Sequence, residues 1–301
     1  MTIQEQIREL KEKKNAVILA HYYARPEVQE IADYIGDSFY LSKIAVKLDN
    51  PIIVYCGVEF MGESGYLLNP DKKVLMPDMT ADCPMAHMVL RQEVEEAREQ
   101  YEDLAVVCYI NSTAEIKSWS DVCVTSANAV KIVNNLPNKN ILFIPDKNLG
   151  RYVAGKVPQK NVMLVKGYCP IHEKISAEEI RMLKSEHPDA EILAHPECNI
   201  EVTQMADYVG STSGIIDYVS GSDKKEWIIA TECGVSYELE KNNPDCQFYF
   251  PATKPICTDM KKITLEKVLD VLKEENNLAG VSDEQADIAR LTLDRMLELA
   301  Q

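Results

Sequence analysis

The sequence repeats itself three times, and this repetition constrains the fold more than any other feature, because repeated segments fold into repeated units. Three segments of 29 residues, beginning at Val17, Ala105 and Glu191, align without a gap. In each one a polar residue ends an apolar run, an Asp follows 12 residues later, and a hydroxyl residue follows 17 residues later. The three sets are His21, Asp33 and Ser38; Tyr109, Asp121 and Ser126; and His195, Asp207 and Thr212.

Each copy also carries one cysteine near its end. The cysteine follows the hydroxyl residue by 45, 43 and 45 residues, within the stretches "TADCPMA", "KGYCPIH" and "KPICTDM". These cysteines are Cys83, Cys169 and Cys257. The other six cysteines have no cysteine at the equivalent positions. Three cysteines that are isolated in the sequence therefore become one set.

Short apolar runs alternate with amphipathic segments, which is typical of βαβ units with parallel strands. We therefore predict an α/β fold of three homologous small α/β/α domains with parallel sheets, in a pseudo-threefold arrangement around a centre where a cluster is bound. A charged amphipathic helix is expected after each cysteine. The predicted segments are an N-terminal helix (1–15), three repeat domains (16–102, 103–188 and 189–276) and a C-terminal helix (277–301).

The charge and composition exclude several classes of function. The formal net charge is −16 and the longest basic runs are pairs, which argues against a nucleic-acid surface. No apolar run approaches the roughly 20 residues of a membrane span, and we see no signal peptide. Nine cysteines, an odd number, do not suggest a disulfide framework. These features predict a cytoplasmic protein.

The strand ends supply acid–base chemistry, since ligands of parallel sheets lie beyond the carboxyl ends of the strands. His21, His195 and Glu197 are candidate acids or bases, and Tyr23 and Tyr109 are candidate proton donors. An amide for orientation comes from one further residue, Asn111. The three hydroxyl residues each precede an amphipathic segment, so we expect them to be helix N-caps that present N–H groups to a carboxylate or phosphate.

Three cysteines brought to one axis allow several interpretations. They are buried thiols, or they bind structural zinc with His172 or His87 as the fourth ligand, although zinc sites favour closely spaced ligand pairs. Alternatively they hold a [4Fe–4S] cluster, whose usual protein ligands are four thiolates. Three thiolates would leave one iron free to act as a Lewis acid toward a substrate oxygen. We prefer the cluster.

Taken together, several motifs resemble the quinolinate synthase family. They are "AHYYARPEVQEIADYIGDS", "YINSTAEIKSWSDVCVTSAN", "PDKNLG", "GYCPIH", "AHPEC", "GSTSG" and "ATECG", which occur in the family's order from about Ala16 to Cys257. The resemblance implies a [4Fe–4S] enzyme of de novo NAD synthesis. Such an enzyme condenses iminosuccinate (iminoaspartate) with dihydroxyacetone phosphate and releases quinolinate, phosphate and water. An iminoaspartate-producing enzyme is then an expected functional partner.

The resemblance also assigns roles to individual residues. The cluster ligands match Cys83, Cys169 and Cys257, and Tyr23 and Glu197 match positions that act in proton transfer. Contacts to the dicarboxylate substrate match His21, Ser38, Tyr109, Ile110, Asn111, Ser126, His195, Pro196, Glu197 and Thr212. Because "KPICTDMKK" holds a single cysteine, no local disulfide switch is expected there.

Three other functions remain open from the sequence. A reductive dehydroxylase of the isoprenoid type also draws three cysteines from three α/β domains, but it needs an electron donor. A radical enzyme of the diphthamide-synthesis kind would need S-adenosylmethionine. A metal-stabilised protein that only binds a small acid would have little need of acid–base groups at the strand ends.

Overall fold

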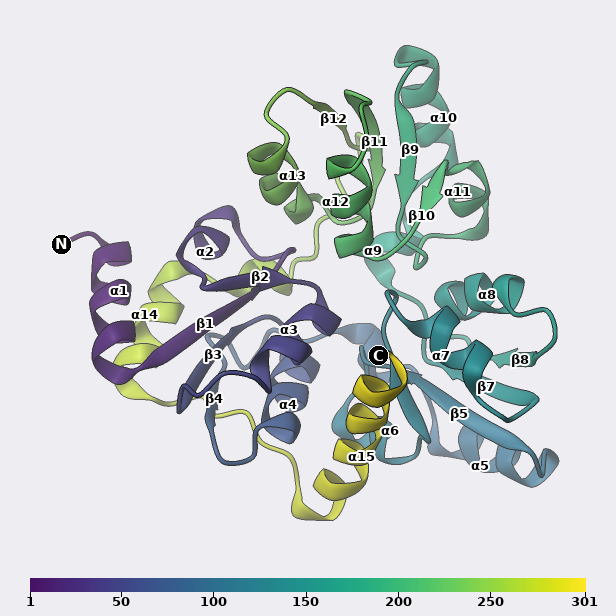
Figure 1. The fold of residues 1–301 in the computed structure, drawn as a ribbon, viewed down its shortest axis with the longest axis horizontal. Helices are drawn as coiled ribbons and strands as arrows, with labels where there is room; N and C mark the ends of the chain where they lie inside the picture. The colour runs from purple at the N-terminus through teal and green to yellow at the C-terminus, as the bar shows by residue number, and fades with distance from the viewer.

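The computed structural model describes residues 1–301 and shows an α/β protein with three separate four-stranded sheets (Figure 1). All strand pairs are parallel. The strand order is β2-β1-β3-β4 in the first sheet, β6-β5-β7-β8 in the second and β10-β9-β11-β12 in the third. The order is the same in all three sheets, so the predicted fold class of three small α/β/α units is confirmed. No helix is both long enough and apolar enough to span a membrane.

The first unit is built on two strands, β1 and β3, that are buried at every residue, as expected where helices cover both faces of a parallel sheet. Its elements are α1 (Ile3–Lys14), β1 (Ala16–His21), α2 (Pro26–Ile31), β2 (Tyr34–Gly36), α3 (Ser38–Ala45), β3 (Ile52–Cys56), α4 (Glu59–Leu68), β4 (Lys73–Leu75) and the 3₁₀ helix η1 (Pro84–His87).

The second unit repeats this plan, and its first strand is again buried throughout. Its elements are α5 (Arg91–Gln100), β5 (Leu104–Tyr109), α6 (Ala114–Ser118), β6 (Val122–Val124), α7 (Ala129–Asn135), β7 (Asn140–Ile144), α8 (Lys147–Lys156), β8 (Asn161–Leu164) and α9 (Pro170–Glu173).

The third unit has the same order of strands, and its first two strands are shorter than their equivalents in the other units. Its elements are α10 (Ala177–Glu186), β9 (Glu191–Ala194), α11 (Ile200–Met205), β10 (Tyr208–Val209), α12 (Thr212–Ser220), β11 (Glu226–Ala230), η2 (Cys233–Val235), α13 (Ser236–Asn242), β12 (Gln247–Tyr249) and η3 (Met260–Lys262). Two helices, α14 (Leu265–Glu274) and α15 (Asp283–Leu299), end the chain.

The aspartate that recurs 12 residues after each strand end has a structural role. Its carboxylate accepts a hydrogen bond from a backbone N–H inside the first strand of its own sheet, and so fixes the entry to the neighbouring strand. The pairs are Asp33 with Ile18 (2.8 Å), Asp121 with Val106 (2.7 Å) and Asp207 with Ile192 (2.8 Å). The aspartate that repeats in the sequence thus makes the same hydrogen bond in each unit.

Each helix that follows a cysteine packs on the sheet of the next unit. Helix α5 packs against β5, α10 against β11, and α14 against β3 and α1 of the first unit. The sequence grouped α14 with residues 189–276, whereas the apolar side chains Val268, Leu269 and Leu272 lie in a core shared with the first unit. The three units therefore form a closed ring.

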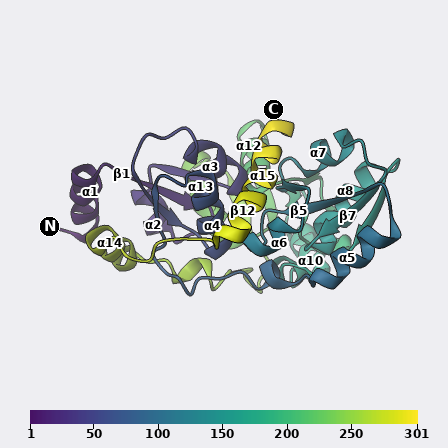
Figure 2. The same ribbon diagram turned by 90° about the horizontal axis from the view of Figure 1, so that it is seen from below.

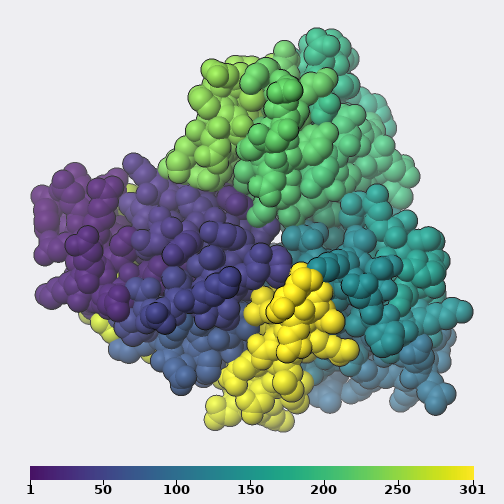
Figure 3. Space-filling model, in the orientation of Figure 1, coloured from purple at the N-terminus to yellow at the C-terminus, as the bar shows by residue number.

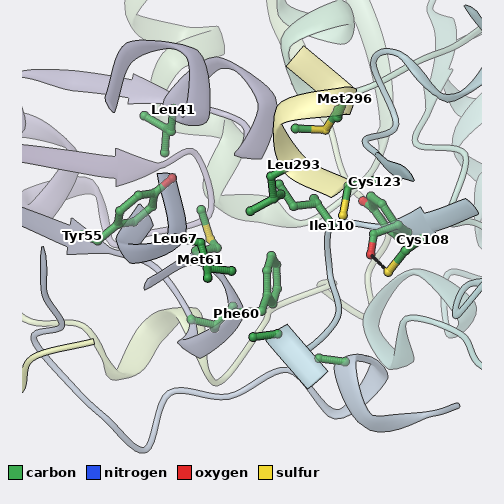
Figure 4. Close-up of a cluster of buried hydrophobic side chains, with 14 of the residues drawn as sticks. Leu41, Tyr55, Phe60, Met61, Leu67, Cys108, Ile110, Cys123, Leu293 and Met296 are labelled. Carbon is green, nitrogen blue, oxygen red and sulfur yellow. Dashed lines mark hydrogen bonds between the residues drawn. The ribbon is translucent and has the colours of Figure 1, made fainter. Parts of the chain in front are cut away.

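The C-terminal helix α15 joins the first two units into one body. It packs against α4 of the first unit and against α6 and β6 of the second. Two views show α15 crossing between these units (Figures 2 and 3). Leu293 and Met296 of α15 lie among buried side chains of both units, in one continuous hydrophobic core (Figure 4). The third unit instead has two smaller cores of its own.

The contact of α15 with both units leads to a stability prediction. Leu293→Ala should lower the free energy of unfolding by about 2–5 kcal/mol, because the side chain is 0% exposed and its removal leaves a cavity. Urea denaturation followed by circular dichroism measures the change. The control is Leu291→Ala on the same helix, which is 66% exposed and should change stability by less than about 0.5 kcal/mol. Equal effects of the two variants would contradict this account of α15.

Candidate active site

A cavity of about 360 Å³ has walls from all three units. It lies at the carboxyl ends of the parallel strands, where open α/β sheets bind ligands. His21 ends β1, Tyr109 ends β5, and His195 directly follows β9. The predicted site residues that line the cavity are His21, Tyr23, Ser38, Cys83, Tyr109, Asn111, Ser126, Cys169, His195, Glu197, Thr212 and Cys257. The equivalent positions that the repeats predicted as site residues therefore lie around one cavity.

Two predicted residues do not line the cavity. Ile110 is 1% exposed and packs in the hydrophobic core (Figure 4). Pro196 is also buried, between His195 and Glu197 in the chain. Each follows one cavity residue and precedes another, and side chains of successive residues point in different directions. Neither side chain is placed to contact a molecule in the cavity.

The expectation that the three hydroxyl residues are N-caps is wrong. The caps are Asp37 for α3, Asn128 for α7 and Ser211 for α12. Ser38 and Thr212 are instead the first residues of their helices, and Ser126 precedes the cap of α7 by two residues. Because other residues cap the helices, all three hydroxyl residues can line the cavity beside the helix starts.

The three cysteines reach the cavity from three separate loops, and each is half-buried. Burial raises the pKa of the Cys83 thiol, and Cys257 raises it further. Burial, Glu197 and Cys83 likewise raise the pKa of Cys169, and burial raises that of Cys257 to about 11. Thiols close enough to oppose one another's ionisation suit a positively charged metal group, which deprotonates the thiols that bind it. None of the other six cysteines lines this cavity.

His172 also contacts the cysteine of the second unit. Its Nδ1 lies 3.2 Å from Cys169 Sγ and 2.7 Å from Glu197 Oε2, and these three residues could hold a metal ion. The same nitrogen faces the carboxylate, so His172 is better placed to orient Glu197 than to complete a zinc site. His87, the other expected zinc ligand, bonds to Asp82 at 2.8 Å. His172 thus contacts one of the three cysteines and Glu197, whereas His87 contacts Asp82.

Glu197 is the central charge of the cavity and is 3% exposed. Burial alone would raise the pKa of its carboxyl group, but the imidazoles of His172 and His195 outweigh burial and hold the pKa at about 2. Asn111 Nδ2 donates to Glu197 Oε1 at 3.4 Å. Burial also lowers the pKa of His195 to about 3 and that of His21 to about 4. At neutral pH the site therefore holds a carboxylate beside two neutral imidazoles.

A chain of hydrogen bonds connects Glu197 to Tyr23 through two residues that were not among the predicted catalytic or substrate-binding residues. His172 Nδ1 faces Glu197, and its Nε2 lies 2.9 Å from Thr231 Oγ1. Thr231 Oγ1 and Thr212 Oγ1 each lie 2.8 Å from the Tyr23 hydroxyl. Burial and then the charge of Glu197 raise the pKa of Tyr23, so its phenol stays protonated and can donate.

Several buried polar atoms of the cavity wall have no partner in the protein. They are Asp37 Oδ2, Asn111 Oδ1 and Thr125 Oγ1. Buried polar groups are almost always hydrogen-bonded, so unpaired ones facing a cavity indicate the positions of ligand or water atoms. The unpaired atoms lie on the first and second units, and Asp37 and Thr125 directly precede Ser38 and Ser126 in the chain. A polar ligand is expected there.

A second hollow of about 590 Å³ lies between α8 of the second unit and α11 and β10 of the third. Its walls include Arg151, Tyr152 and Tyr208, but none of the predicted site residues. It is larger than the cavity described above, yet it lacks a convergent set of acids, bases and metal ligands. The cavity of about 360 Å³ is therefore the better candidate for the active site.

Comparison with known proteins agrees with this geometry. The family model described as "Quinolinate synthetase A protein" matches residues 5–298. A quinolinate synthase of Clostridioides difficile is 52% identical over 296 residues, which cover 98% of this chain and 97% of the relative. One from Fusobacterium nucleatum is 52% identical, with 99% of each chain covered. One from Aquifex aeolicus is 46% identical, with 99% and 94% covered.

Proposed function

The chain belongs to the quinolinate synthase family, and we propose that it condenses iminosuccinate with dihydroxyacetone phosphate to give quinolinate, phosphate and water. One observation supports the proposal above the others. Three cysteines, a buried carboxylate, two neutral imidazoles and two phenols share one small cavity. Family membership makes the chain an enzyme and does not favour the reductive dehydroxylase, the radical enzyme or the pure binding protein.

We infer that Cys83, Cys169 and Cys257 would hold a [4Fe–4S] cluster. Thiolates are the normal protein ligands of such clusters, and the raised pKa values of these thiols suit a group that brings positive charge. When bound, a cluster with three protein ligands would supply a Lewis acid at its fourth iron and assist the loss of water. Nine free cysteines suit a reducing cytoplasm, which is where we expect the enzyme and its iminosuccinate-producing partner to act.

The substrate carboxylates are proposed to bind at the helix starts. Ser38 begins α3 and Thr212 begins α12, so their hydroxyl groups lie beside backbone N–H groups at the positive ends of these helices. Ser126 Oγ lies 3.2 Å from His195 Nε2 and completes the set from the second unit. Donors from three units would hold the dicarboxylate in one orientation, in a protein whose net charge is −16.

Proton transfers are proposed to run through Glu197 and the two tyrosines. Glu197 is ionised at neutral pH and can accept a proton at Oε1 or Oε2. Tyr23 and Tyr109 keep their protons, because burial and the charge of Glu197 raise both pKa values. His21 and His195 are neutral, so each can accept a proton or donate a hydrogen bond.

The activity is tested with protein purified and reconstituted without oxygen. Dihydroxyacetone phosphate and iminosuccinate formed from oxaloacetate and ammonia are added, and quinolinate is measured by chromatography. Quinolinate formation without any reductant or S-adenosylmethionine is the expected result. A requirement for an electron donor would point to the dehydroxylase, and tight binding of the acid with no product would point to the binding protein.

The contacts of Thr231, which the sequence did not predict, lead to a test by mutation. Thr231→Val keeps the shape of the side chain but removes the oxygen that contacts both Tyr23 and His172. We expect kcat to fall by about tenfold, with KM and iron content nearly unchanged, because the phenol loses one of its two partners. Thr203→Val, outside the cavity, is the control and should retain full activity. An unchanged kcat in Thr231→Val would remove Thr231 from the mechanism.

A further inference from the structure

Each loop that carries a cavity cysteine is anchored to the helix that follows the third strand of its own sheet. The first residue of that helix donates its backbone N–H to the carbonyl group two residues before the cysteine. The pairs are Glu59 with Ala81 (2.8 Å), Lys147 with Gly167 (2.8 Å) and Cys233 with Pro255 (2.9 Å). This backbone bond is common to all three units.

In the second unit a buried carboxylate adds another anchor. Asp146 is 0% exposed and caps α8, since its Oδ1 accepts from the backbone N–H groups of Asn148 (2.8 Å) and Leu149 (2.7 Å). Its other oxygen, Oδ2, accepts from the backbone N–H of Cys169 at 3.1 Å. One side chain therefore links the start of α8 to the cysteine itself.

The third unit has the same device with a longer side chain. Glu232 is 0% exposed and occupies the position equivalent to Asp146, directly before η2. Its Oε2 accepts from Gly234 N at 2.6 Å. Its Oε1 accepts from Cys257 N at 3.0 Å and pairs with Lys261 Nζ at 2.9 Å. As in Asp146, one oxygen of Glu232 contacts the helix start and the other contacts the backbone of the cysteine.

The first unit lacks this second anchor. The equivalent position is Val58, which precedes α4 and makes no side-chain bond to it. The backbone N–H of Cys83 is bonded instead to Asp82 Oδ1 at 2.6 Å, and Asp82 is the preceding residue in the same loop. Such a local contact does not connect Cys83 to the sheet. The backbone of Cys83 thus lacks the carboxylate link that Cys169 and Cys257 have.

We propose that Asp146 and Glu232 are positioning residues that hold the backbones of Cys169 and Cys257. The proposal rests on the proposed cluster site, but both links join parts of the chain to each other, so they can be tested in metal-free protein. A carboxylate suits this task because it has two acceptor oxygens, whereas an amide has one.

The first experiment measures amide hydrogen exchange in the metal-free full chain labelled with ¹⁵N-cysteine. Asp146→Ser keeps a helix-capping oxygen but cannot reach Cys169. We expect exchange at the Cys169 amide to rise at least about tenfold, with Cys257 and Cys83 unchanged. Glu232→Ser, which likewise keeps a capping oxygen but cannot reach Cys257, should accelerate exchange at Cys257 alone. Unchanged exchange at the targeted cysteine, or equal acceleration at all three, would overturn the proposal, since the latter indicates general destabilisation.

The second experiment measures how fast an iron chelator removes the cluster from reconstituted protein, followed by visible absorbance. Asp146→Ser and Glu232→Ser should each lose the cluster about tenfold faster than the unmodified protein. Ser176→Ala, which removes the cap of α10 without touching a cysteine, should match the unmodified protein. Unmodified protein that takes up no cluster would refute the proposed function, and the exchange measurement would still decide the anchors. Unchanged loss rates in both variants would overturn the positioning role.

Discussion

Replacing any one of Cys83, Cys169 and Cys257 by alanine should remove the cluster and abolish quinolinate formation. About four irons and four sulfides per chain are expected in the unmodified protein reconstituted without oxygen. Each variant should lose nearly all of both, because two remaining thiolates from two units cannot hold a cubane that needs at least three. Iron and sulfide assays, with visible and electron paramagnetic resonance spectra, measure the loss.

The matched control for these variants is a cysteine outside the cavity. Cys246→Ala changes a half-buried cysteine of the third unit that lies against a separate core, and it should keep both cluster and activity. Cys198→Ala is a more demanding control, since Cys198 is 1% exposed and donates to the Ala230 carbonyl group. One zinc per chain with no sulfide, or retained iron in a cavity variant, would contradict the threefold ligand set.

Glu197→Gln should lower kcat by about 10²–10⁴-fold while the cluster remains. The amide keeps the size of the side chain and can still accept from Asn111, but it carries no charge and cannot take a proton. It also removes the anion that His172 contacts at 2.7 Å. Steady-state quinolinate formation measures kcat, and iron and sulfide assays establish that the cluster is intact.

The control for Glu197 is Glu178→Gln on the exposed face of α10, which should leave kcat unchanged. Separate values of kcat and KM distinguish two roles for Glu197. A large fall in kcat with little change in KM for iminosuccinate agrees with proton transfer, whereas a rise in KM alone would assign Glu197 to binding. Full turnover by Glu197→Gln with its cluster intact would remove Glu197 from catalysis.

Comparison of the three copies of the sequence was enough to find the strand-end residues, the hydroxyl residues and the cysteines of the cavity, because the contacts themselves repeat. Strand ends, the strand-fixing aspartates such as Asp33, and the cysteines recur at equal intervals, so their equivalence is visible without a structure. The fold class follows from the same register. The helix caps were misassigned by one or two residues, because a polar residue adjoins each predicted cap and local patterns do not choose between them.

Comparison of the three copies could not assign roles to residues that have no equivalent in the other copies. Thr231 directly follows β11, but the corresponding residues after β3 and β7 are Gly57 and Pro145, so no repeated signal marks it. His172 is likewise alone at its position in the three cysteine loops, so the sequence suggested it only as a zinc ligand and not as a link between Glu197 and Thr231. The amphipathic pattern of α14 predicts a buried face, but it does not tell which sheet that face will cover. Such contacts depend on tertiary packing.

The closure of the ring by α14 and α15 has a consequence for the order of events during synthesis. The buried residues of the third unit's two cores all lie between Ile175 and Leu239, so these cores are synthesised before the two C-terminal helices. The core shared by the first two units extends from Ile7 to Met296 and is complete only when α15 has been made. The cavity, which has walls from all three units, is therefore completed after all three of its cysteines have been made.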